Sequence, residues 1–263
     1  MFSATRATIV ITGLEWILIA VAAFLAGGVN ALAGGGTLLT FPVLTAAGIP
    51  AVMANVTNSV ALCPGYFGGT LAQRRDLVGQ GARLRLLLPI GALGGVVGGW
   101  LLLESGEKLF RALVPWLIIG AATLLALQDP LRRWLLQRAA ARERHAFATS
   151  AAAVPIGLAA IYGGYFGAGL GVIMLATLGL TLDDTLTRLN AVKQALSFVI
   201  NVAAAIYFLF SGQVAWAVAG VMAVAALAGG AAGGRIAGRI EPALLRKVVV
   251  VIGFAVGGFY LSR

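Results

Sequence analysis

Ten long apolar segments, separated by short polar gaps, limit what this chain can fold into more than any other feature. Most of them reach the length of about 20 residues that an α-helix needs to cross a bilayer. Because backbone groups in lipid must be hydrogen-bonded within the chain, helices are expected throughout. The segments cover residues 14–33, 37–48, 51–72, 84–103, 109–127, 147–168, 171–182, 188–210, 214–234 and 243–261.

The composition excludes the common soluble classes. Of 263 residues, 60% are hydrophobic and 11% are charged, and the mean hydropathy is +0.97. A soluble domain carries about 25% charged residues, so a water-soluble enzyme, a disulfide scaffold and a disordered tail are all excluded. The single cysteine, Cys63, and the single histidine, His145, leave no internal disulfide and no multi-ligand metal site, so no cofactor is expected.

The net charge of +10 reflects membrane orientation rather than nucleic-acid binding. Basic residues gather in the polar gaps, as they do on the cytoplasmic side of membrane proteins. We therefore expect a multi-pass protein of the plasma membrane, of the bacterial inner-membrane type, with both termini outside. Gaps 73–85, 128–146 and 235–247 are predicted to be cytoplasmic, and gaps 104–108 and 211–213 external.

Two segments, 37–48 and 171–182, are only about a dozen residues long, and each follows a glycine cluster. Such short apolar pieces are typical of half-helices or re-entrant segments. The sequence leaves open whether they cross the membrane completely.

An internal repeat is indicated at an offset of 135 residues, which aligns residues 28–128 with 163–263. Seven glycines coincide in this register, where random placement would give roughly three. Five segments per copy would invert the second copy, and inverted repeats are typical of secondary transporters with a site at the repeat interface. The predicted fold is an all-α polytopic membrane protein with repeats at 14–127 and 147–263, joined by a basic linker at 128–146.

The two glycine clusters read GVNALAGGGTLLT, from Gly28 to Thr40, and GGYFGAGLGVIML, from Gly163 to Leu175. With these motifs the chain resembles the TauE/SafE family of sulfite and organosulfur-anion transporters, in which two glycine-rich motifs each open a short helix. The likeness extends over nearly the whole chain. It implies a membrane protein that moves a small anion.

Two related segments carry polar stripes at matching positions. Polar groups in lipid are costly, so the stripes should face protein or a wet cavity. They line a substrate pathway or, alternatively, join helices by hydrogen bonds. One stripe comprises Asn190, Lys193, Gln194, Ser197 and Asn201, and the other Asn55, Asn58, Ser59 and Tyr66.

Lys193 is the one basic residue well inside an apolar segment. Its ammonium, among amides and a hydroxyl, would suit an oxyanion. The alternative is that the side chain extends to the membrane surface, since Arg188 is only about 7–8 Å away along the helix.

The glycine clusters predict a second source of positive potential. A helix that begins inside the membrane leaves N–H groups free and places its positive dipole end there. Close helix packing is the alternative interpretation. The predicted ligand-approaching positions are Gly34, Gly35, Gly36, Gly169 and Gly171, with Asn30 and Tyr165 beside the breaks.

These features predict a transporter of a small anion, of the sulfite, thiosulfate or sulfoacetate type, working by alternating access. No Asp or Glu lies deep in a segment, so export of an anion driven by the membrane potential is favoured. An anion channel or facilitator is the alternative, and an intramembrane enzyme is disfavoured because no nucleophile–base pair or metal cluster is present. Coupling to H⁺ or Na⁺ and assembly into a homo-oligomer are left open.

Overall fold

The computed structural model describes residues 11–32, 35–141, 152–236 and 242–262. These residues form helices and connecting turns and contain no strand, which confirms the predicted all-α membrane fold. The helices are α1 (Gly13–Leu32), α2 (Thr37–Ala46), α3 (Ala51–Ala72), η1 (Arg74–Leu77), α4 (Gly81–Ala126), α5 (Gln128–Ala141), α6 (Ala153–Tyr165), α7 (Leu170–Thr181), α8 (Leu186–Leu209), α9 (Trp216–Ile236) and α10 (Pro242–Leu261). Four of them, α1, α4, α8 and α10, are long and apolar enough to cross a membrane.

Helix α4 combines two of the predicted segments. It is 46 residues long and contains one non-helical residue, Gly106, with φ 63° and ψ 175°. Glycine adopts this left-handed conformation without the steric penalty that a Cβ imposes. Gly106 therefore divides α4 into two arms, 81–105 and 107–126, which correspond to the predicted segments 84–103 and 109–127.

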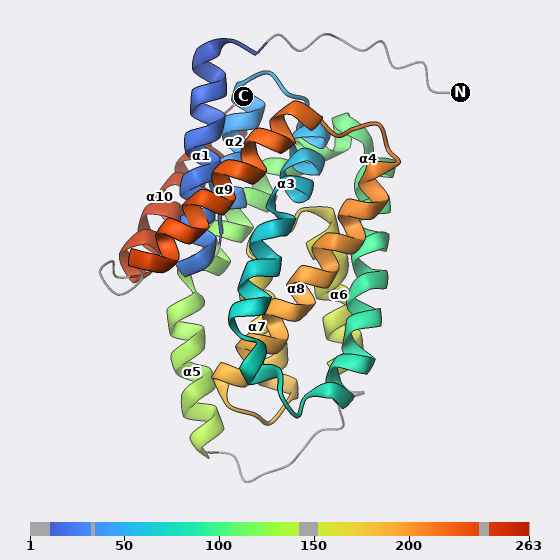
Figure 1. The fold of residues 1–263 in the computed structure, drawn as a ribbon, viewed down its shortest axis with the longest axis vertical. Helices are drawn as coiled ribbons and strands as arrows, with labels where there is room; N and C mark the ends of the chain where they lie inside the picture. The colour runs from blue at the N-terminus through green and yellow to red at the C-terminus, as the bar shows by residue number, and fades with distance from the viewer. Residues whose placement is uncertain (1–10, 33–34, 142–151, 237–241, 263) are drawn as a thin grey trace.

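The two short helices do not cross the bundle. Figure 1 shows that α1 runs into the molecule from its upper end and that α2 turns back toward that end. Helices α6 and α7 form a similar pair from the opposite end, where α5 projects. Both short helices thus begin inside the protein, as the re-entrant interpretation predicted.

The helix boundaries follow the predicted offset of 135 residues. Helices α3 and α8 begin at residues 51 and 186, and the first arm of α4 and α9 begin at 81 and 216. The packing is reciprocal as well, since α1 packs on α9 and α6 packs on α4. This correspondence supports the repeat, while the inverted relation of the two copies stays a prediction.

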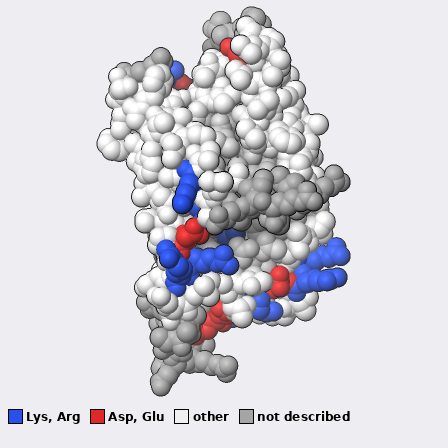
Figure 2. Space-filling model, turned by 90° about the vertical axis from the view of Figure 1, so that its left-hand side faces the viewer, with Lys and Arg blue, Asp and Glu red and all other residues white. Residues whose placement is uncertain are grey.

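The outer surface is largely apolar. Large side chains such as Trp116, Val154 and Phe210 are exposed, which is typical of a surface that faces lipid rather than water. Figure 2 shows one face on which most charged side chains gather in the lower part, with a wide uncharged area above them.

Glycines hold the broken helix pairs against the other repeat. A methyl group on Gly98 of α4 would lie 2.0 Å from the carbonyl oxygen of Ile161 in α6, and one on Gly229 of α9 would lie 1.8 Å from that of Phe24 in α1. The backbones meet at distances that only glycine permits. We call these close backbone contacts at mid-helix glycines the glycine seams.

We expect Gly98→Ala to destabilise the protein by about 1–3 kcal/mol, because the added methyl group would force α6 away from α4. Gly120→Ala, in the same helix, is the matched control because no atom lies within 4 Å of the added methyl group. Thermal unfolding in detergent measures both. Equal melting temperatures for the two variants would contradict the seam.

Candidate functional site

The polar stripe of α8 faces the C-terminal half of α3. The Asn190 amide donates to Oε1 of Gln73, just beyond α3, at 2.7 Å. The Gln194 amide lies over Gly69, where a Cβ would be only 2.6 Å from Nε2. One turn of α3 earlier, the Tyr66 hydroxyl lies beside the Asn201 side chain. The α8 stripe therefore lies against α3, and Tyr66 with Asn201 joins the two stripes.

Lys193 points toward the second glycine break rather than along this interface. A methyl group on Gly171 would lie 3.9 Å from Cδ and 4.0 Å from Nζ of Lys193. The lysine is half-buried. Within the part of the chain that the structure describes, its ammonium has no hydrogen-bond acceptor and no carboxylate partner. The structure thus brings together two of the predicted site residues, from α7 and α8.

The residues around the first glycine break are hydrogen-bonded to side chains of the same predicted repeat. The Gly36 amide donates to Oδ1 of Asn30 at 2.8 Å, and Gly35 has φ 94°. Asn58 of α3 is buried and accepts from the Thr40 hydroxyl, while its amide donates to the Thr37 hydroxyl at 3.3 Å. Gly34, also predicted to belong to the site, lies outside the described residues.

The same position has different surroundings in the two repeats. At the offset of 135, Asn58 corresponds to Lys193, while Thr37 and Thr40 correspond to Val172 and Leu175. Helix α2 therefore offers two hydroxyls to the Asn58 amide, whereas α7 has apolar side chains at the corresponding positions. Asn58 is hydrogen-bonded, and the ammonium of Lys193 has no partner among the described residues.

The second break is fixed by left-handed glycines and by contacts from the first repeat. Gly167 and Gly169 have φ 77° and 76°, and the Tyr162 hydroxyl donates to the carbonyl of Ala168 between them at 2.6 Å. The Asn55 amide of α3 donates to the backbone carbonyl of Tyr165 at 2.9 Å. The Tyr165 hydroxyl itself donates to Ser105, away from the lysine.

Two buried polar atoms of the stripe residues, one on α3 and one on α8, lack hydrogen-bond partners among the described residues. Oδ1 of Asn55 and Oγ of Ser197 have no hydrogen bond, although both residues are almost completely buried. Unsatisfied groups of this kind are rare and indicate an unfilled water or ligand position or a second conformation. Two further stripe residues donate hydrogen bonds to the backbone of their own helix. Ser59 donates to the Asn55 carbonyl, and Asn201 donates to the Ser197 carbonyl.

An ion-paired layer lies where α8 begins, and sequence patterns gave no sign of its partners. Asp184 binds Arg83 of α4 at 2.5 Å and Arg188 of α8 at 3.0 Å. The Arg188 guanidinium also donates to the Val78 carbonyl, and the buried Gln80 amide donates to the Arg188 carbonyl. Because Arg83 and Asp184 are 101 residues apart, only the packing of α4 against α8 reveals that pair.

A second contact missed by sequence reasoning is the cap of α3. Both carboxylate oxygens of Glu107 accept from the first amides of this helix, Ala51 at 2.7 Å and Val52 at 2.9 Å. A carboxylate at a helix N-terminus satisfies free N–H groups and complements the helix dipole. Glu107, in the predicted external gap, thus fixes the helix that carries Asn55 and Asn58.

Comparison with known proteins decides the family. The model for the family described as "Sulfite exporter TauE/SafE" matches residues 19–260, nearly the whole chain. The chain belongs to the TauE/SafE family. No solved structure matches it.

Curated relatives of this TauE/SafE protein are named as membrane transporters. The probable membrane transporter protein YfcA of Escherichia coli (strain K12) is 26% identical over 230 residues, which cover 88% of this chain and 83% of the relative. A probable membrane transporter protein of Haemophilus influenzae is 29% identical over 231 residues and covers 88% of both chains. The relative named ORF9 from a Sinorhizobium species is 28% identical over 240 residues, with 89% and 88% coverage. The chain is thus a transporter-family membrane protein.

The ion-paired layer should give the protein a specific acid sensitivity. Burial by itself would raise the pKa of the Asp184 carboxyl, but hydrogen bonds from the Thr185 amide, Arg83 and Arg188 outweigh it and hold the pKa below 3.8. Stabilisation by Asp184 is therefore complete above its unfolded pKa of about 3.9 and is lost as the pH falls through the lower folded value.

We expect Asp184→Asn to lower the melting temperature by a constant amount above about pH 5, and the difference from wild type to shrink below about pH 4. Thermal unfolding in detergent across this range measures it. Asp76→Asn is the control, since Asp76 forms no ion pair among the described residues. A difference that did not change with pH would contradict the role of the Asp184 charge.

Proposed function

We propose that this protein carries a small anion across the plasma membrane, of the sulfite, thiosulfate or sulfonate class, by alternating access between its two repeats. The observation that carries the proposal is the uncompensated ammonium of Lys193 beside the second break. The family name, which refers to sulfite export, supports the substrate class.

The chemistry at Lys193 suits an oxyanion better than a neutral or cationic solute. An ammonium removed from bulk water attracts a negative charge strongly, because the surrounding dielectric is low. Helix α7 begins at Leu170, so its positive dipole end adds to the potential beside Gly171. The Ser197 hydroxyl, four residues further along α8 and without a hydrogen-bond partner, can donate a further hydrogen bond to the oxyanion.

The arrangement of the helices also suits alternating access. Each broken helix pair packs on the other repeat through glycine seams, which present smooth backbone surfaces for sliding. The ion-paired layer of Arg83, Asp184 and Arg188 joins the start of α4 to the start of α8. We infer that this layer opens when the site faces the side of the membrane on which the layer lies.

Export requires no proton relay. A negative-inside potential contributes about 2.3 kcal/mol per charge per 100 mV toward moving an anion outward. The apolar segments hold no deep carboxylate, which favours this direction over accumulation.

The principal test is anion flux in proteoliposomes loaded with sulfite, thiosulfate, a sulfonate or chloride. We expect Lys193→Ala to raise the apparent KM for the transported anion about tenfold or more, because a charged hydrogen bond contributes roughly 1.5–3 kcal/mol. Lys193→Arg keeps the charge and should retain part of the activity. Lys108→Ala, which removes a lysine from the predicted external gap, is the matched control.

Unchanged flux and KM in Lys193→Ala would contradict the binding role. Transport of chloride but of no sulfur anion would overturn the substrate class. Counterflow distinguishes the two modes of transport, because a carrier exchanges labelled for unlabelled anion and a channel conducts without saturation.

The proposed orientation is tested separately. The start of α1 and the end of α10 lie at the same end of the molecule, opposite α5 (Figure 1), and we propose that this end faces outward. Alkaline phosphatase fused after Arg263 should be active and green fluorescent protein dark, with the reverse for fusions after Ala141. The opposite pattern would reverse the proposed sidedness.

A further inference from the structure

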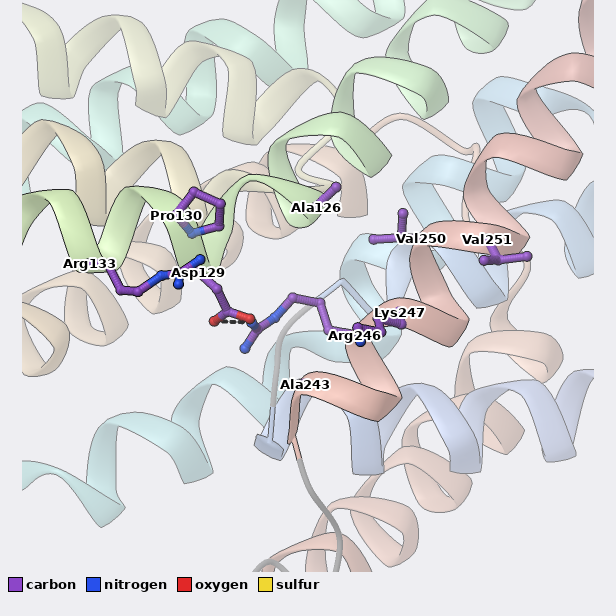
Figure 3. Close-up of a pocket in the computed structure, with 9 residues that line it drawn as sticks. All are labelled: Ala126, Asp129, Pro130, Arg133, Ala243, Arg246, Lys247, Val250 and Val251. Carbon is purple, nitrogen blue, oxygen red and sulfur yellow. Dashed lines mark ion pairs between the residues drawn. The ribbon is translucent and has the colours of Figure 1, made fainter.

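A cavity of about 440 Å³ lies where the end of α4 and the start of α5 meet the first turns of α10, and Lys193 is not among the residues that line it. Figure 3 shows its side chains converging from these three helices. The lining residues are Ala126, Asp129, Pro130, Arg133, Ala243, Arg246, Lys247, Val250 and Val251.

The cavity has an excess of positive charge. Three basic side chains, Arg133, Arg246 and Lys247, face one carboxylate, Asp129. The Arg246 side chain is only 10% exposed and forms an ion pair with Asp129. Its buried Nε has no hydrogen-bond acceptor among the described residues. A buried guanidinium with a free donor is an unfilled position for a further anionic oxygen.

The same cavity opens onto an apolar helix surface. Val250 and Val251 form one wall, and Val251 is 67% exposed. Along the outer face of α10, Leu244, Val248 and Phe254 are exposed as well. An apolar stripe of this kind on a membrane helix lies against acyl chains.

We propose that this cavity binds the phosphate headgroup of an anionic phospholipid, with the acyl chains lying along α10. Arg246 donates from its fixed, buried guanidinium, and the exposed Arg133 and Lys247 complete the phosphate site from α5 and α10. Basic pockets between membrane helices near the charged surface are suited to such headgroups. A soluble anion would use the charges but not the adjoining apolar face, so the combination favours a lipid.

The proposed lipid site joins the first turns of α10 to the start of α5. Because α5 continues from the second arm of α4, a bound headgroup would neutralise the repulsion among the three cations and hold α10 against α4. We therefore expect anionic lipid to stabilise the folded protein, independently of which substrate it transports.

The test is lipid retention in nanodiscs of phosphatidylcholine mixed with phosphatidylglycerol, followed by native mass spectrometry of the released protein. We expect wild type to retain phosphatidylglycerol and to melt at a higher temperature with it than in phosphatidylcholine alone. The double variant Arg133→Gln/Lys247→Gln should bind it roughly tenfold to thirtyfold more weakly, since each basic residue near the surface contributes about 1 kcal/mol.

The matched control is Arg132→Gln/Lys108→Gln, which removes the same charge outside the cavity and should retain phosphatidylglycerol like wild type. Equal retention by the two double variants would overturn the proposal. Protection by inorganic phosphate as strong as that by phosphatidylglycerol would identify a soluble-anion site instead. Should the double variant not fold, the single variant Lys247→Gln and the melting of wild type in the two lipids still decide the question.

Discussion

The close approach of helix backbones at the glycine seams supports the rest of the structure. Where α4 meets α6, Gly94, Gly98 and Gly164 leave no room for a single methyl group. Packing at this distance places the α6–α7 pair directly against the first predicted repeat. The start of α7, and with it Gly171, is thereby held at the depth where Lys193 of α8 reaches it.

The two repeats use matching positions for different purposes. Asn58 bonds to hydroxyls of α2 and ties the first break into a satisfied network. Lys193 stands at the corresponding place with no such partners, because α7 carries valine and leucine there. Matching positions of the two predicted repeats thus hold one hydrogen-bonded amide and one ammonium without a partner among the described residues. That difference explains why a single lysine, and not a pair, is the focus of the proposed anion site.

Much of the fold and part of the site could be predicted from the sequence. Hydropathy located every α-helix except α5, whose apolar positions are too mixed with arginine to stand out. The glycine clusters located both breaks, helical spacing indicated the polar stripe of α8, and the offset of 135 indicated that of α3. Sequence spacing could not show that Asn58 is satisfied by α2 whereas Lys193 is not. Nor could it pair Asp184 with Arg83 or Glu107 with the start of α3, since those contacts join residues far apart in the chain.

The sequence by itself determined that this is a membrane protein of ten apolar segments, with two short helices that begin at glycine breaks. It did so because lipid forces backbone hydrogen bonds to be local, so the helical structure of each segment can be predicted from its own residues. Only the tertiary structure decided which polar residues are satisfied, which helix ends are joined by ion pairs, and where Arg246 meets Asp129. These outcomes depend on distances between different helices, and such distances are set by packing rather than by local sequence.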